Sequence, residues 1–223
     1  MSSMMSSSSY SVWDELLPGN DGQTVNDLVK KQYDVIYGEW PNDYNEIVLV
    51  VDSLNEVDDY TLYALGLKSE DDMMAAMDAV MNGEMLEVKE ESWSYEEICD
   101  MEFRVIFPGD CYVQDPNTGL FTDLRLTEAG ERYLYDNGTK LRVTGIIRPN
   151  ENTSSPMIAG SIAYTAKLTE HVIEQSRKSG SVQAQIADPS TDVITGLPFK
   201  ATTGSLTNAQ KAAELRAHVG ELG

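Results

Sequence analysis

Five consecutive apolar residues, IVLVV at positions 47–51, constrain the fold of this chain more than any other feature. The run has the length of a strand, and most of its residues are β-branched, which favours extended backbone. A strand without polar residues on either side is usually covered on both faces. We therefore expect a fully buried strand at this position.

The stretch before the run, YGEWPNDYNE, has the composition of a rigid turn. Pro41 fixes its own φ angle, and Asn42 and Asp43 tolerate turn geometry. Trp40 can therefore pack its ring over the end of the strand, so the stretch is interpreted as a corner rather than a ligand site. Beyond that role, the aromatic edges of Trp40 and Tyr44 are candidate contacts for a protein partner, because Trp and Tyr contribute strongly to protein interfaces.

Two more strands are predicted. Residues 103–107 alternate between apolar and polar side chains, and residues 141–147 belong to an apolar segment that ends at Pro149. Between them, the sequence DPNTG at 115–119 separates two aromatic-containing arms, which is typical of a β-hairpin.

The same turn contains oxygen side chains that a calcium loop would use, from Asp115, Asn117 and Asp123. However, Gly119 stands one position too early for an EF-hand, and no glutamate closes the loop. We favour the hairpin over a metal site.

Helical spacing and capping residues predict short helices at residues 58–66, 70–82 and 166–179, the first two capped by Asp58 and Ser69. A stripe of methionines on the second helix has two interpretations, a surface for an apolar ligand or filler for the core, and the core is favoured. The stripe consists of Met73, Met74, Met77 and Met81.

The third helix is expected to turn Leu168, Val172 and Ile173 inward. Residues 11–22 are expected to form one helical turn that Pro18 and Gly19 end. Together, these elements predict an α+β fold in which short helices pack on a mixed or antiparallel sheet.

The charge of the chain excludes several partners. Thirty-seven acidic residues against sixteen basic ones give a net charge of −21, which repels nucleic-acid phosphates and anionic lipid. Most of this charge is interpreted as an aid to solubility. No apolar stretch reaches the roughly 18–20 residues of a membrane span, and the N-terminus has neither part of a signal peptide. The chain as written is expected to be soluble.

The sequence contains no motif of a known catalytic or cofactor site. The two histidines, His171 and His218, have no second histidine at metal spacing, and the metalloprotease, serine-hydrolase and phosphate-loop motifs are missing from the sequence. A pair of carboxylates working as in a glycosidase stays open, because acidic residues are abundant. We predict a protein that is not an enzyme, with no cofactor and no metal.

The only cysteines of the sequence, Cys99 and Cys111, both lie in apolar surroundings. A disulfide between them is one interpretation, and two free, half-buried thiols are the favoured one.

Several segments, taken in order, resemble the extracellular core of FtsX/MacB-type ABC transporter permeases of Gram-positive bacteria. The resemblance covers about residues 33–200, most of the chain. The segments read YDVIYGEWPNDYNEIVLVVD, YTLYALGL, EICDMEFRVIFPGDCYVQD, GTKLRVTGIIRPNE and GSIAYTAKLTEHVIEQSRKSGSVQAQ. The resemblance implies an extracellular core domain at residues 16–200. Outside it, the Ser/Met-rich N-terminus predicts a flexible lead-in at residues 1–15, and the amphipathic pattern at 201–223 is interpreted as the start of a second lobe or a linker helix. The more variable second lobe of the family is missing or only begun.

The resemblance also implies a function. In this family a separate cytoplasmic ATPase subunit supplies the energy, and the extracellular domain receives a peptide, lipoprotein or cell-wall protein without performing chemistry. The chain would then lie on the outer face of the cell membrane as part of the full-length permease. The alternative is a free-standing secreted binding or adhesion module, and a third hypothesis is an acid-based glycosidase.

Overall fold

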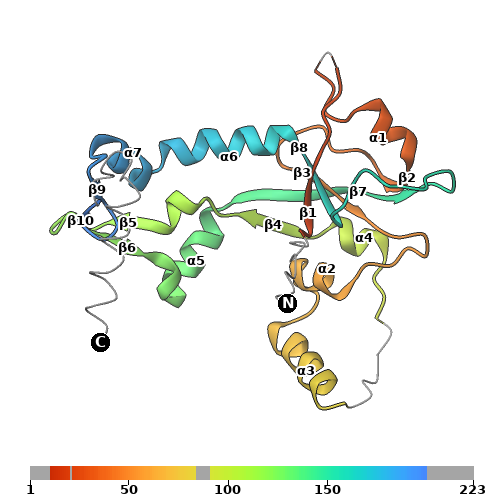
Figure 1. The fold of residues 1–223 in the computed structure, drawn as a ribbon, viewed down its shortest axis with the longest axis horizontal. Helices are drawn as coiled ribbons and strands as arrows, with labels where there is room; N and C mark the ends of the chain where they lie inside the picture. Colours follow the sequence, from red (N-terminus) through yellow and green to blue (C-terminus); the bar gives the residue numbers. More distant parts are fainter. Residues whose placement is uncertain (1–10, 21, 84–90, 200–223) are drawn as a thin grey trace, which may run out of the picture.

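The computed structural model describes residues 11–20, 22–83 and 91–199, and it contains a mixed sheet of six strands with short helices around it (Figure 1). The predicted α+β class is therefore confirmed. The strand order is β1-β8-β3-β7-β2, with β4 also paired to β7. These strands are β1 Trp13–Leu16, β2 Tyr33–Gly38, β3 Glu46–Val50, β4 Glu102–Val105, β7 Thr139–Pro149 and β8 Ile162–Thr165.

Seven α-helices and two 3₁₀ turns accompany the sheet in the described part of the chain. The helices are α1 Asp27–Gln32, α2 Asp59–Ala64, α3 Glu70–Met81, α4 Tyr95–Cys99, α5 Glu128–Asn137, α6 Ala166–Lys178 and α7 Gly180–Ala187. The 3₁₀ turns are η1 Pro108–Cys111 and η2 Leu124–Leu126. Two small hairpins pair β5 Tyr112–Gln114 with β6 Phe121–Asp123, and β9 Thr191–Asp192 with β10 Leu197–Pro198.

The long strand β7 organises the molecule. It runs parallel to β3 on one side, and on its other side β4 and β2 pair antiparallel with its first and second halves. Figure 1 shows β7 and α6 both extending from the sheet to a distal end built from α5, α7 and the two small hairpins. The sheet and this distal end are thus connected by β7 with its partner β4, which leads into η1 and β5, and by α6.

Side chains of β3 alternate between two core clusters. Ile47 and Leu49 belong to one cluster, with Leu141, Ile146 and others, whereas Val48 belongs to a second. The second cluster also contains Leu16, Val25, Val29, Tyr33, Ile147 and Ala163. Because successive side chains of a strand point to opposite faces, the expectation of a strand covered on both sides is confirmed.

Several local predictions are also confirmed. The side chain of Asp58 accepts a hydrogen bond from Thr61 N at 2.8 Å, so it caps α2, and Gly66 follows the helix at φ +70°. The predicted hairpin at 112–123 is present, and β7 includes all of the predicted strand 141–147. Helices α3 and α6 lie at the predicted positions.

The helical turn expected over residues 11–22 is wrong. Trp13–Leu16 is a strand that pairs in parallel with β8, about 150 residues later in the chain. This tertiary pairing overrides the local pattern. Residues 13–15 also belong to the sheet and not to a flexible lead-in, whereas residues 1–10 and 200–223 lie outside the described part of the chain.

Three further predictions need correction. Met74 and Met81 are 57% and 83% exposed, so neither fills the core, and the side chains of the other two methionines of the stripe are not among those described. Ile173 is exposed, because it lies about 100° around α6 from the inward-facing Val172. The strand predicted at 103–107 is instead β4, which ends at Val105 because η1 begins at Pro108.

Candidate functional site

The stretch that connects β2 to β3, residues 38–46, contains both candidate partner contacts, and we call it the corner. Its first residue, Gly38, has φ +68°, and a Cβ there would lie 2.1 Å from Thr144 O of β7. Only glycine fits such a position, because both the φ angle and the clash exclude a side chain. Pro41, three residues on, is fully buried. The corner is thus pressed against the sheet.

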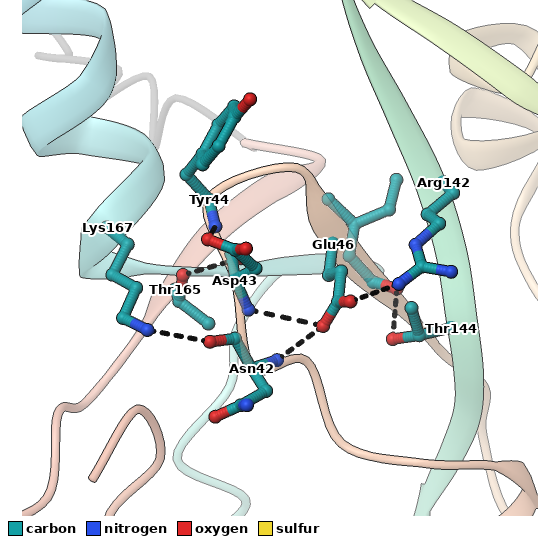
Figure 2. A network of polar contacts seen from close by, with 9 residues as sticks. Asn42, Asp43, Tyr44, Glu46, Arg142, Thr144, Thr165 and Lys167 are labelled. Atoms are coloured by element: carbon teal, nitrogen blue, oxygen red, sulfur yellow. Dashed lines mark hydrogen bonds and ion pairs between the residues drawn. The ribbon is translucent and has the colours of Figure 1, made fainter.

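The carboxylate of Glu46 lies inside the corner (Figure 2). It accepts hydrogen bonds from Asn42 N at 2.7 Å and Asp43 N at 3.2 Å, and it forms an ion pair with Arg142 of β7. Burial alone would raise the pKa of Glu46, but these hydrogen bonds and the guanidinium charge outweigh burial, so the pKa lies below its usual value. Glu46 is therefore an ionised structural group that closes the turn.

Side chains from α6, from β8 and from the loop before α1 donate hydrogen bonds to the backbone carbonyls of the corner. Lys167 Nζ of α6 donates to Asn42 O at 2.8 Å, and Thr165 Oγ1, fully buried at the end of β8, donates to Asp43 O at 3.2 Å (Figure 2). Thr24 Oγ1 donates to Pro41 O at 3.0 Å. Three consecutive carbonyls are thus satisfied by residues distant in sequence, which holds the corner in one conformation.

The two predicted contact residues point to different neighbours. Trp40 is half-buried and packs against the core cluster that contains Val48 and Ile147. The ring of Tyr44 stacks on His171 of α6, with centroids 4.1 Å apart and an interplanar angle of 21°. His171 also lies 6.0 Å from the ring of Phe107. The corner prediction for Trp40 therefore agrees with the packing, and both residues stay partly exposed to solvent.

The sequence did not indicate the partners of the corner. Glu46 pairs with a residue 96 positions later in the chain, and Lys167 reaches back 125 positions. Such contacts carry no local signal, so Glu46, Arg142, Lys167 and His171 could be identified only from the structure. The signal that was present locally, from Gly38 and Pro41, indicated the turn itself.

Hollows in the described part of the chain lie away from the corner. One of about 220 Å³ lies between α5 and the segment 105–113, and Asp110 is the only carboxylate of its lining. Burial raises the pKa of Asp110. A more open hollow of about 640 Å³ near the end of β7 includes the exposed residues Asp34 and Glu151.

The hairpin turn uses its oxygens for local structure. Asp115 Oδ1 accepts a hydrogen bond from Asn117 N at 2.8 Å, Asp123 pairs with Arg125, and Gly119 adopts φ +73°. Across residues 11–20, 22–83 and 91–199, no group of three or more His, Cys, Asp or Glu side chains is arranged to hold a metal ion.

Both cysteines are free thiols. Cys111 is buried, with its Sγ 3.7 Å from Phe107 O, and Cys99 is half-buried against the first core cluster. Burial and the nearby charge of Asp100 raise the pKa of Cys99, which disfavours the reactive thiolate.

Comparison of the chain with protein-family models, with curated proteins and with solved structures finds no match. Among the helices of the described residues, none has the length and apolar character needed to cross a membrane.

Proposed function

We propose that this chain is the extracellular domain of an FtsX/MacB-type ABC transporter permease. In this role it performs no chemistry. It couples ATP hydrolysis by a separate cytoplasmic subunit to a peptide, lipoprotein or cell-wall partner outside the membrane. The proposal depends on the ordered series of sequence segments that resemble this family.

The observation that carries the proposal is where these segments lie in the fold. The first forms β2, the corner and β3, the fourth forms β7, and the last begins with β8. These four strands are neighbours in one sheet, in the order β8-β3-β7-β2. The segments therefore build one continuous structural unit, as expected if the resemblance reflects a shared domain.

The connections within the molecule suit the transmission of motion. Helix α6 has thirteen residues, a length of about 20 Å, and it joins the sheet to the distal end together with β7 (Figure 1). Lys167 and His171 fasten α6 to the corner. A displacement of α6 would therefore act directly on the β2–β3 connection. In this role the outer edges of Trp40 and Tyr44 are the contacts we propose for a partner.

The test is the location of the domain in cells that express the full-length protein. Leu126 is 79% exposed, so a cysteine at this position, in a background with Cys99→Ala and Cys111→Ala, provides a labelling site. We expect a membrane-impermeant maleimide to label it equally in intact and permeabilised cells, and the protein to purify from detergent with an ATPase subunit.

Two results would contradict the proposal. Labelling only after permeabilisation would place the domain inside the cell. Release of the protein into the medium, without an ATPase, would instead support the free-standing secreted binding module. The variant without a cysteine at position 126 controls for labelling of other groups.

A further inference from the structure

The negative charge of the chain is concentrated in one region. Residues 52–102 contain 16 acidic and only two basic residues, so they contribute −14 of the net −21. Within this region, α3 has no basic residue in its last turn, where cations would favour the helix dipole. Asp78 lies in that last turn, where the dipole disfavours a negative charge, so this carboxylate does not stabilise the helix.

One face of α3 alternates carboxylates with methionines. Asp71, Met74, Asp78 and Met81 are spaced by three, four and three residues, which places them on one side of a helix. All four are exposed, Met74 at 57% and Met81 at 83%. We call this face the acidic methionine stripe.

The stripe has no partner in the part of the chain that the structure describes. Helix α3 projects away from the sheet beyond α2 (Figure 1), and it makes no extensive contact with another described helix or strand. The side-chain carboxylates of Asp71 and Asp78 form no hydrogen bond or ion pair with described residues, in contrast to that of Asp72, which accepts a hydrogen bond from Ser69 N at 3.0 Å. Both the charge and the apolar surface of the stripe are therefore available.

We propose that the acidic methionine stripe is a docking surface for a basic amphipathic helix of another protein. Methionine side chains are flexible and polarisable, so they adapt to apolar residues presented at helical spacing. The carboxylates between them would pair with lysine or arginine at the edge of that apolar face and would accelerate association. The inference concerns this surface alone, and it holds whether or not the chain belongs to a permease.

The charge of the stripe selects this occupant over two others. A second copy of the chain would bring the same negative charge to the same face, and like charges across an interface are unfavourable. An anionic lipid surface is repelled for the same reason. A basic helix is the partner whose charge and apolar face both match the stripe.

The experiment measures binding of a labelled synthetic helix of about 18 residues, built from leucine and lysine with leucine on one face, to the full chain at about 0.15 M salt. A peptide of the same composition with scrambled order, and no apolar face, is the matched probe. We expect the amphipathic peptide to bind at least about tenfold more tightly than the scrambled one, because only it can cover the methionines.

Paired variants locate the site. Met74→Gln with Met81→Gln should weaken binding about tenfold, and Asp71→Asn with Asp78→Asn should weaken it about threefold and reduce its dependence on salt. Gln keeps the length and helix propensity of Met. Two control variants lie at the distal end. Leu126→Gln removes exposed apolar surface, and Glu131→Gln with Asp136→Asn removes two negative charges. Each should change binding less than about twofold.

Three results would overturn the proposal. Equal binding of the scrambled peptide would show a general electrostatic attraction, and an equal effect of the distal variants would place the site elsewhere. Unchanged binding by the methionine variant would remove the stripe as the site. Helix content and urea unfolding of each variant confirm that a loss of binding is not a loss of fold.

Discussion

The corner and the acidic methionine stripe are both rich in acidic and apolar residues, but the two regions use them in opposite ways. At the corner, Glu46 is bound by two backbone N–H groups and by Arg142, and three successive carbonyls accept hydrogen bonds from distant side chains. On α3, Asp71 and Asp78 have no described partner, and Met74 and Met81 face solvent. The carboxylate of Glu46 and the three carbonyls of the corner are therefore paired within the molecule, whereas the two carboxylates of the stripe have no described partner.

This contrast separates structural from functional polar residues. A carboxylate that satisfies buried donors is required for folding, so its removal leaves those donors unpaired. An exposed carboxylate on an isolated helix contributes little to folding. Substitutions at the corner should therefore change stability, whereas equivalent substitutions on α3 should change only binding.

The largest effect is expected from Gly38→Ala. The new Cβ would lie 2.1 Å from a backbone oxygen, at φ +68°, so we expect a loss of about 3 kcal/mol or more in the free energy of unfolding. Gly83→Ala, at the end of α3, is the matched control, because its φ is +70° but no atom lies within 4 Å of the added Cβ. Its cost should be about 1 kcal/mol. Urea unfolding measures both, and equal losses would contradict the close approach at Gly38.

Glu46→Gln is expected to have the second largest effect. An amide cannot reproduce the ionic bond to Arg142 or accept as strongly from Asn42 N, so the free energy of unfolding should fall by about 2 kcal/mol. Asp78→Asn, the same loss of one charge on α3, should change it by less than about 0.5 kcal/mol. If both variants unfolded at the same urea concentration, the structural role of Glu46 would be refuted.

The pKa of Glu46 predicts how this difference depends on pH. A carboxyl group whose pKa is lower in the folded than in the unfolded state stabilises the fold at pH values above its unfolded-state pKa. This stabilisation is lost as the pH falls through its folded-state pKa. The difference in the free energy of unfolding between wild type and Glu46→Gln should therefore have its full size at about pH 7. It should shrink as the pH falls below the ordinary glutamate pKa of 4.5. The difference between wild type and Gly83→Ala involves no titrating group and should not change with pH. If the difference between wild type and Glu46→Gln grew in acid, a lowered pKa of Glu46 in the folded state would be contradicted.

The parts of the fold that the sequence predicted are those with a strong local signal. The apolar runs of β3 and β7 and the cap of α2 are visible within a few residues. Strands β1 and β8 are four residues each and are defined by pairing with each other and with β3, so a local pattern could not reveal them.

Two helices that were not predicted, α4 and α5, have a capping residue at the N-terminus. Ser94 and Glu97 form a capping box at α4, a pattern readable in the sequence SYEE. Thr127 caps α5, because its Oγ1 accepts a hydrogen bond from Gly130 N. The candidate site also combines features with and without a local signal. Pro41 and Gly38 indicated the turn, whereas the residues that bind it, Arg142, Lys167 and His171, come from distant parts of the chain.

A smaller effect is expected from Tyr44→Ala, which removes the stacked pair with His171. Aromatic pairs contribute about 1 kcal/mol beyond burial of area, so we expect a loss of about that size in the free energy of unfolding. Tyr63→Ala on α2 removes a tyrosine that is 40% exposed, and its cost should be smaller. A larger loss for Tyr63 than for Tyr44 would mean that the stack does not hold α6 to the corner.

The smallest effect is expected from replacing the two exposed methionines of the stripe by alanine. Met74→Ala with Met81→Ala removes apolar surface that is already in contact with water, and alanine favours a helix at least as well as methionine. The free energy of unfolding should therefore change by less than about 0.5 kcal/mol. Buried methionines would behave differently, because a Met→Ala substitution in a core costs about 2–5 kcal/mol. A loss in that range would place these side chains in the core, as the sequence pattern suggested, and would leave the stripe without an apolar surface to offer a partner.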